Sequence, residues 1–342
     1  MENLDIFACP RTGERLVHDS AAGVLIGWSH RYAVQDNILR LNPELQDASL
    51  RDYYETVNGK KPAVVGDFFD GELDPVEGYY RRSKKCALVD LLPADLGIAL
   101  DVGGGSGEIL RSLIQHAGSR CAAIVVLDWA SSAMRPFARS LADSPGHVFV
   151  EADATRLPIR DGSVDFIFNS EMIEHLQPSQ SEAMLAEFRR VLKPGGKVLL
   201  TTPNGLEYRR VLQESILTLM LLGTGRRPSD LVSRERLKAR LFRPYLKVTG
   251  HHFADLEAVE SNAQIGHFNV LRPRALARQA QRQGLVVQRM LVRIFVPILV
   301  PRGIKAGRRD PRALDRFETL VQKLRLDRFF LSCQMHLLEK PA

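Results

Sequence analysis

The chain has 342 residues, of which 45% are hydrophobic, and carries a formal net charge of +7. This supplies enough apolar material for a large core in addition to one minimal α/β domain. The first residues lack the pattern of a secretory signal, and no uninterrupted apolar stretch reaches the ~18 residues of a membrane span. The four scattered cysteines form neither a disulfide framework nor a paired metal-ligand spacing. We therefore expect a cytoplasmic protein with reduced thiols.

Residues 1–45 are expected to form a small β-rich unit around their own apolar residues. The stretches FACPRTGERLVHD and LIGWSHRYAVQDNILRLNPE resemble a small zinc ribbon, in which two Cys-x-x-Cys pairs hold the metal. Here Cys9 is present, Thr12 stands where its partner belongs, and Leu25 and Trp28 stand near the second pair. Because tetrahedral zinc needs four ligands, we predict a leader without metal.

Residues 46–95 are interpreted as a linker followed by helices that lead into the main domain. The acidic stretch Asp67–Glu77 contains Gly and Pro and is expected to be a loop. A Tyr-Tyr-Arg-Arg run follows it, just before the first strand of the main domain.

The segment Ala99–Glu108, ALDVGGGSGE, is the most informative part of the chain. Gly97–Val102 is expected to be a short buried strand, and Ile109–Gln115 the helix that follows it. The alternating glycines between them permit a sharp turn and let a ligand lie against bare main chain. This is the nucleotide-binding device of open α/β sheets. A dinucleotide fingerprint would need glycine where Glu108 stands, and no Gly-Lys-Ser/Thr follows, so a phosphate-binding P-loop is excluded.

Further apolar runs predict the remaining strands of an open α/β sheet. They are Ala122–Leu127, His147–Val150, Val164–Phe168, Lys197–Thr202, Gly284–Phe295 and Phe329–Leu338. Helices are expected over Pro273–Gln283 and 310–327, and Leu192–Gly196 is expected to close a helix and form a turn. The second run ends in Asp128, and a carboxylate at that strand end can accept both ribose hydroxyls of an adenosine.

The D-x-G-x-G-x-G turn and the phrases DATRLPIRDGSVDFIFNSEMIEHL and EFRRVLKPGGKVLLTTPN resemble the class I S-adenosylmethionine (SAM) methyltransferases, in particular the ubiquinone/menaquinone methyltransferase group. The resemblance covers about residues 79–204 and recurs weakly at 266–294. It implies an α/β fold with a doubly wound, seven-stranded, mostly parallel Rossmann-like sheet. The methyltransferase domain would span 96–342, with 205–265 as a helical substrate lid. Zinc-ribbon-like leaders precede some enzymes of this kind and occur in the activator of tRNA methyltransferases.

Carried over position by position, the resemblance implies a SAM site at the carboxyl ends of the strands. Its residues are Asp101, Gly103, Gly105 and Gly107 for the methionine part, Asp128 for the ribose, Trp129 on the adenine or over the pocket, Asp153 and Ala154 for the adenine edge, Asn169, Ser170 and Glu171 beside the sulfonium, and Tyr80 or Arg82 over the SAM carboxylate. No metal ligand is predicted.

Histidines are the candidate general bases, because imidazole titrates near neutral pH. His175 belongs to a Glu-His pair, with Glu174, that the family places just after the fourth strand. Packing beside the cofactor is an equal alternative for this residue. His251, His252 and His267 lie in the segment expected to cover the site, and a surface or packing role is open for each of them.

The C-terminal part differs in charge from the rest. Residues 206–342 hold 26 Lys and Arg against 12 Asp and Glu, whereas residues 1–205 hold 21 against 28. This asymmetry indicates an anionic partner: a phosphate-bearing small substrate, a lipid surface or a nucleic acid. Apolar stretches with basic flanks, Val211–Gly223 and Met290–Ile304, are compatible with peripheral membrane contact or with lid and core. The basic stretch has few interleaved aromatic residues, which ranks RNA below small molecules.

Together these patterns predict a class I SAM-dependent methyltransferase that acts on an oxygen or nitrogen atom of a small-molecule or lipid-linked acceptor in a biosynthetic reaction. SAM is the expected cofactor. An RNA base methyltransferase is the alternative within enzymes. A SAM-binding regulatory protein without transferase activity is the alternative from another class.

Overall fold

A computed structural model gives the fold, and all structural statements below refer to the residues that it describes. These are residues 5–19, 22–41, 68–69, 75–141, 146–207, 215, 269–295 and 311–342. Of the expected lid, 205–265, only residues 205–207 and 215 belong to this set. The candidate histidines His251, His252 and His267 lie outside it.

The centre of the molecule is a seven-stranded sheet with the order β7-β6-β5-β8-β9-β11-β10. Its strands are β5 (Ile98–Val102), β6 (Ala123–Asp128), β7 (His147–Glu151), β8 (Val164–Ser170), β9 (Leu192–Pro203), β10 (Val286–Phe295) and β11 (Leu331–Glu339). The strands from β7 to β9 are parallel, and β11 is antiparallel to both of its neighbours. The expected α/β fold with a mostly parallel Rossmann-like sheet is therefore confirmed.

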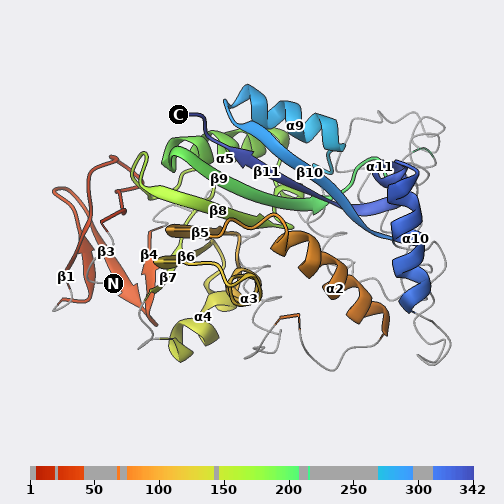
Figure 1. Cartoon of the computed structure of the whole chain (residues 1–342). Helices are drawn as coiled ribbons and strands as arrows, with labels where there is room; N and C mark the ends of the chain where they lie inside the picture. The colour runs from red at the N-terminus through yellow and green to blue at the C-terminus, as the bar shows by residue number, and fades with distance from the viewer. Residues whose placement is uncertain are drawn as a thin grey trace, which may run out of the picture.

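Helices cover both faces of this sheet (Figure 1). On one face lie α5 (Pro178–Val191) and α9 (Pro273–Arg282), and on the other α2 (Pro75–Val89), α3 (Glu108–Ala117) and α4 (Ser131–Ser140). Beside one end of the sheet stand α10 (Pro311–Lys323) and the short α11 (Asp327–Phe330). None of the helices in the described ranges combines the length and the apolar character needed to traverse a bilayer.

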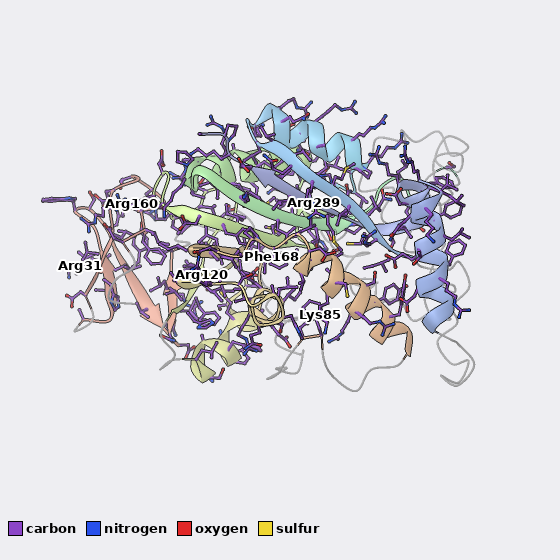
Figure 2. The ribbon with its side chains drawn as sticks, in the orientation of Figure 1. Arg31, Lys85, Arg120, Arg160, Phe168 and Arg289 are labelled. Carbon is purple, nitrogen blue, oxygen red and sulfur yellow. The ribbon has the colours of Figure 1, made fainter. Side chains whose placement is uncertain are left out.

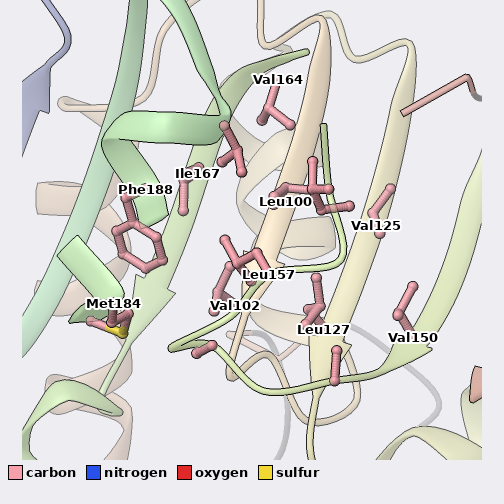
Figure 3. Packing of buried hydrophobic residues seen from close by; sticks show 14 of the residues in the cluster. Leu100, Val102, Val125, Leu127, Val150, Leu157, Val164, Ile167, Met184 and Phe188 are labelled. Carbon is pink, nitrogen blue, oxygen red and sulfur yellow. The ribbon is translucent and has the colours of Figure 1, made fainter. Parts of the chain in front are cut away.

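The central strands are apolar on both faces over most of their length, because each contributes to two cores. On β5, Leu100 and Val102 face the core beneath α5, whereas Ala99 faces the core beneath α2 and α3. Successive side chains of a strand point to opposite faces, so a parallel sheet covered on both sides has no polar face. Figure 3 shows the first of these cores, where Phe188 of α5 packs over Ile167. Figure 2 shows Phe168 in the central part of the molecule and Arg31 on the leader at one end.

The leader does not stand apart from this sheet. Its strands β1 (Val17–Asp19), β2 (Val24–Ile26), β3 (Arg31–Gln35) and β4 (Ile38–Arg40) form an antiparallel meander. β4 then pairs in parallel with β7, which extends the whole sheet to 11 strands. The two-residue turn between β3 and β4, Asp36-Asn37, has φ of 53° and 61°, the left-handed conformation that tight hairpins require. The expected β-rich leader is present, and the domain limits at 45 and 95 stay predictions.

Two local expectations differ from the structure. The stretch Asp67–Glu77 is expected to be a loop, but α2 begins within it at Pro75, because proline is favoured in the first turn of a helix. Leu192–Gly196 was expected to end a helix in a turn, but α5 ends at Val191 and β9 begins at once. The residue before a proline disfavours helical backbone, so Lys193 before Pro194 stops the helix. The register of β9 against β8 then shifts between Leu192 and Lys197, which places Pro194 and Gly195 in an irregular part of the strand.

Candidate active site

A cavity of about 650 Å³ opens where β5, β6, β7 and β8 end. Its size is within the range that holds a cofactor or a drug-sized ligand. Seven of the residues expected in the cofactor site line it: Gly103, Gly105, Asp128, Trp129, Asp153, Ala154 and Glu171. His175, Glu171 and Met172 line it from the side of β8.

The glycine turn forms one wall of the cavity with main chain. Gly105 has φ +54°, and a Cβ placed there would meet nothing nearer than Ala133, at 3.9 Å. Its backbone is therefore bare toward the open space, as a closely approaching ligand requires. Gly107, with φ +73°, begins α3, and a Cβ there would lie 2.5 Å from Val126. Gly107 thus permits helix and sheet to pack closely, and it is not among the lining residues.

Asp128, at the end of β6, is held in a fixed orientation by main-chain donors. Its Oδ2 accepts a hydrogen bond from the Gly105 amide at 3.0 Å, and its Oδ1 accepts one from the Ala130 amide at 2.9 Å. A carboxylate oxygen can accept more than one hydrogen bond. The carboxylate therefore bridges the ends of two strands and keeps acceptor capacity toward a diol in the cavity.

The loop after β7 supplies the opposite wall. Asp153 accepts hydrogen bonds at Oδ1 from the Thr155 amide, at 2.7 Å, and from the Thr155 hydroxyl, at 2.8 Å. This local turn fixes the backbone of Ala154, which is buried. The two positions expected to contact an adenine edge therefore lie side by side on the cavity wall.

Three other expected cofactor residues lie behind the cavity wall. Asn169 donates a hydrogen bond from Nδ2 to the Val102 carbonyl at 2.7 Å and so ties β8 to the end of β5. Tyr80 lies in α2, where its ring packs 5.6 Å from that of Tyr79, and it is not a lining residue. Asp101 is 1% exposed beneath the glycine turn. These placements correct the expectation of direct contact and give the residues supporting positions.

Asp101 has an unusual environment. Its Oδ2 has no hydrogen-bond partner among the described residues, and burial, with the charge of Asp128 adding to it, raises the pKa of Asp101 to about 8. A Cβ on Gly104 would lie 2.5 Å from the Asp101 carboxyl carbon, so only glycine permits the turn to lie on this carboxyl group. A cationic group entering the cavity would find a buried acid without a counter-charge behind the turn.

Glu171 and Lys84 form a partly buried ion pair at the floor of the cavity. Lys84 Nζ lies 3.1 Å from Glu171 Oε1, and the Thr201 hydroxyl donates to the same oxygen at 3.0 Å. Burial alone would raise the pKa of Glu171, but the charge of Lys84 and the hydrogen bonds from Lys84 and Thr201 outweigh it and lower the pKa. Glu171 has a φ of +54°, so its backbone is held in a conformation that is uncommon for a residue with a side chain. Glu171 is thus a charged carboxylate lining the cavity.

The pKa of Glu174, three residues after Glu171, is shifted in the opposite direction. It is 1% exposed, and its Oε2 accepts a hydrogen bond from the Thr202 hydroxyl at 2.9 Å. Burial, together with the neighbouring charge of Glu171, raises the pKa of Glu174 to about 8. Two nearby carboxyl groups whose pKa values are shifted in opposite directions are typical of sites that handle protons.

Several of the residues singled out from the sequence line this cavity, but the sequence reasoning did not single out Lys84. The residue lies on α2, four residues after Tyr80 and four before the buried Leu88. Tyr80, Lys84 and Leu88 follow one another at helical spacing on the face of α2 that packs against the sheet. A lysine on such an apolar face is a signal that could have indicated an acidic partner in the interior. Of the candidate bases, His175 reaches the cavity, whereas His251, His252 and His267 lie outside the described residues.

Comparison with known proteins gives a family match over part of the chain. Residues 100–200 match the model of a family described as "Methyltransferase domain". The biotin biosynthesis bifunctional protein BioHC of Cellvibrio japonicus is 33% identical over 181 residues, which are 50% of this chain and 34% of that protein. The ubiquinone/menaquinone biosynthesis C-methyltransferase UbiE of Brucella anthropi is 37% identical over 109 residues, 30% of this chain and 38% of that protein.

A malonyl-[acyl-carrier protein] O-methyltransferase of a Marinomonas species is 32% identical over 117 residues, 34% of this chain and 41% of that protein. The chain thus spans 34–41% of the length of these curated relatives. Among solved structures, a complex of the Haloferax volcanii Trm112 methyltransferase activator and a putative methyltransferase matches with a TM-score of 0.48 and 19% identity, covering 86% of this chain and 98% of the matched one.

Proposed function

We propose that the chain is a class I SAM-dependent methyltransferase, because residues 100–200 match a methyltransferase domain, and that it methylates an oxygen or nitrogen atom of a small-molecule or lipid-linked acceptor. One observation carries the proposal. A single cavity has the glycine turn, Asp128 and Asp153 on one side and Glu171 and His175 on the other. A cofactor and an acceptor can therefore meet inside it.

The cofactor half of the cavity fits SAM by its chemistry. Asp128 would accept the ribose hydroxyls, Ala154 and Asp153 would meet the adenine edge, and the bare backbone at Gly105 would lie along the methionine part. The Oδ2 of Asp101 is buried and has no hydrogen-bond partner among the described residues, and the ammonium group of SAM, once bound in front of the turn, would favour the ionised carboxylate and be stabilised by it. When bound, SAM supplies a methyl group already activated on a sulfonium.

The acceptor half supplies position and a place for the proton. Glu171, kept charged by Lys84, would accept a hydrogen bond from the hydroxyl or amine of the acceptor and orient its lone pair. His175 would take the proton as the acceptor atom bonds to the methyl carbon and the carbon–sulfur electron pair returns to sulfur. The relatives described above include a malonyl-[acyl-carrier protein] O-methyltransferase and a ubiquinone/menaquinone biosynthesis C-methyltransferase, which supports an acceptor of the small-molecule or lipid-linked class.

An experiment on acceptor extracts tests this function. The purified chain is incubated with SAM and, separately, with small-molecule, lipid and RNA extracts, and the S-adenosylhomocysteine formed is measured. We expect product with the small-molecule or lipid extract. His175→Ala should lower the rate by about 100-fold, the usual contribution of a positioned base, with little change in the affinity for SAM. His116→Ala, an exposed histidine on α3, is the matched control.

Two outcomes contradict the proposal. Formation of S-adenosylhomocysteine with the RNA extract alone would replace the acceptor class. Binding of SAM without product in any extract would favour a regulatory protein. A rate for His175→Ala equal to that of the His116→Ala control would remove His175 from the mechanism.

A further inference from the structure

Three metal-ligating side chains converge in the leader, far from the cavity described above. They are Cys9, Glu14 and His30, and their Sγ, carboxylate and ring-nitrogen atoms lie within 4.8 Å of one another. Cys9 Sγ is 3.7 Å from His30 Nδ1, and His30 Nδ1 is 3.8 Å from Glu14 Oε1. The contacts come from three separate positions in the chain, so the fold, and not the sequence spacing, brings them together.

Backbone turns hold the three residues in place. Cys9 donates its amide to the Glu14 carbonyl at 2.7 Å, and Gly13 donates to the Cys9 carbonyl at 2.8 Å. A second turn, in which Gly27 donates to the His30 carbonyl at 2.9 Å, presents the histidine. These hydrogen bonds close two short loops whose tips face each other, an arrangement that can hold a metal ion between them.

The Glu14 carboxylate is fixed from both sides. Its Oε1 accepts a hydrogen bond from the Ser29 amide at 3.1 Å. A Cβ on Gly27 would lie 2.4 Å from the same oxygen, so glycine is required for this approach. A carboxylate oriented in this way loses little further freedom when it binds a cation.

The distances between the ligand atoms of His30, Cys9 and Glu14 fit coordination of one shared metal ion better than direct hydrogen bonds between the side chains. The 3.8 Å between His30 and Glu14 is too long for a hydrogen bond, although both groups are oriented toward the same point. In a tetrahedral zinc site the ordinary bond lengths place sulfur and nitrogen about 3.5 Å apart, and nitrogen and oxygen about 3.4 Å apart. The separations of His30 from Cys9 and from Glu14, 3.7 and 3.8 Å, exceed these values by a few tenths of an ångström, which small side-chain rotations would remove.

We propose that Cys9, Glu14 and His30 bind one Zn²⁺ ion, with the Tyr32 hydroxyl or a water molecule in the fourth position. The Tyr32 hydroxyl lies 3.0 Å from Cys9 Sγ. Thiolate, imidazole and carboxylate together are a ligand set that suits zinc. This revises the expectation of a leader without metal, which considered only the lost cysteine positions.

The site has an access route and a structural consequence. Cys9 and the residues after it line a second cavity, of about 700 Å³, between the leader and residues 156–161. Beside it, Ala8 donates its amide to the Pro158 carbonyl at 3.0 Å, and Arg160 donates to the Ile6 carbonyl at 2.7 Å. The metal would therefore stiffen the part of the leader that is bonded to the segment following Asp153 and Ala154.

Metal titration of the full chain tests the site. The purified protein is stripped with a chelator and titrated with Zn²⁺ against a chromophoric competitor, and with Co²⁺, whose visible spectrum reports tetrahedral thiolate ligation. We expect one Zn²⁺ per chain with a Kd below about 1 µM, as in structural zinc sites. Cys9→Ser and His30→Ala should each weaken binding at least ~100-fold. His30→Cys should retain binding, and Cys86→Ser, at an exposed cysteine on α2, should behave like the wild type.

Absence of stoichiometric binding in the wild-type chain would overturn the proposal, and this result does not depend on whether any variant folds. Binding that is equally strong in Cys9→Ser and Cys86→Ser would overturn it as well, because the metal would then be held elsewhere. Neither outcome affects the proposed methyl transfer, whose site contains none of these residues.

Discussion

The two sides of the active-site cavity are built from different chemistry. The side formed after β5, β6 and β7 uses main chain, glycines and carboxylates held by backbone amides. The side formed after β8 uses charged side chains in direct contact, Lys84 with Glu171, and a second carboxyl group, Glu174, close by. In the proposed function, the first side would recognise the shape and hydrogen-bonding edges of the cofactor. The second side would control the charge and the proton of the acceptor.

The largest effect should come from filling the cofactor side. Gly105→Arg places a long side chain in the cavity and at a φ of +54°, so we expect the affinity for S-adenosylhomocysteine to fall at least ~100-fold in equilibrium dialysis. Gly118→Arg is the control, because Gly118 has a similar φ of +63° but lies at the end of α3 with open space around it. Its backbone strain of about 1–2 kcal/mol should lower stability and leave ligand affinity unchanged. Equal losses of affinity in both variants would show that strain, and not occupation of the cavity, is responsible.

The next effect concerns the dependence of stability on pH. Glu174 has its pKa raised from 4.5 to about 8 in the folded chain, so folding favours its protonated form. The stability that this gives is fully present below the pKa of the unfolded chain and is lost as the pH rises through about 8. The free energy of unfolding should therefore fall between pH 5 and 8, with up to about 1.4 kcal/mol per pH unit from this group.

Glu174→Gln keeps an oxygen that can accept the hydrogen bond from Thr202 and removes the titration. Urea unfolding of this variant should show a flatter pH profile than the wild type, with a residual slope from Asp101, whose pKa is shifted in the same direction. A profile that coincides with that of the wild type over this range would mean that Glu174 is charged in the folded chain.

The smallest effect should come from breaking the ion pair on the acceptor side. Lys84→Met leaves Glu171 without its cation, but the Glu171 side chain is 37% exposed toward the cavity, so solvent moderates the cost. We expect a loss of about 1–3 kcal/mol in urea unfolding, with the affinity for SAM within a factor of about three of the wild type. Lys85→Met, on the outer side of the same helix (Figure 2), is the control and should cost less than about 1 kcal/mol. A variant that lost SAM binding while keeping its stability would show that the two sides are not independent.

The sequence predicted the parts of the fold that local patterns determine. Apolar runs of strand length predicted β5, β6, β7 and β8, because a parallel strand is determined by the pattern of a few consecutive residues. The end of the second run placed Asp128 at a strand end, and Asp128 lines the cavity. Asp101 and Asn169, which the sequence also assigns to the cofactor site, are buried and do not line the cavity. Whether a side chain lines the cavity or lies beneath its lining depends on how the helices and strands pack together, and no local sequence pattern determines this.

Long-range pairings could not be predicted in the same way. The parallel pairing of β4 with β7 joins residues more than a hundred positions apart, Ile38 with Phe149 for example. Lys84 and Glu171 are also far apart in the sequence but form an ion pair in the structure. The approach of His30 to Cys9 depends on the relative position of two turns, which no local sequence pattern determines. Sequence spacing showed a missing cysteine at Thr12, whereas the fold supplied other ligands.

Calorimetric titration of the wild-type chain with SAM tests the central claim most directly. The cavity at the ends of β5, β6 and β7 should bind SAM at one site per chain, and Asp128→Ala should abolish the heat of binding while Asp90→Ala, at an exposed position after α2, should preserve it. A titration with NAD should give no heat. Binding of NAD in place of SAM, or SAM binding that is unchanged in Asp128→Ala, would contradict the account.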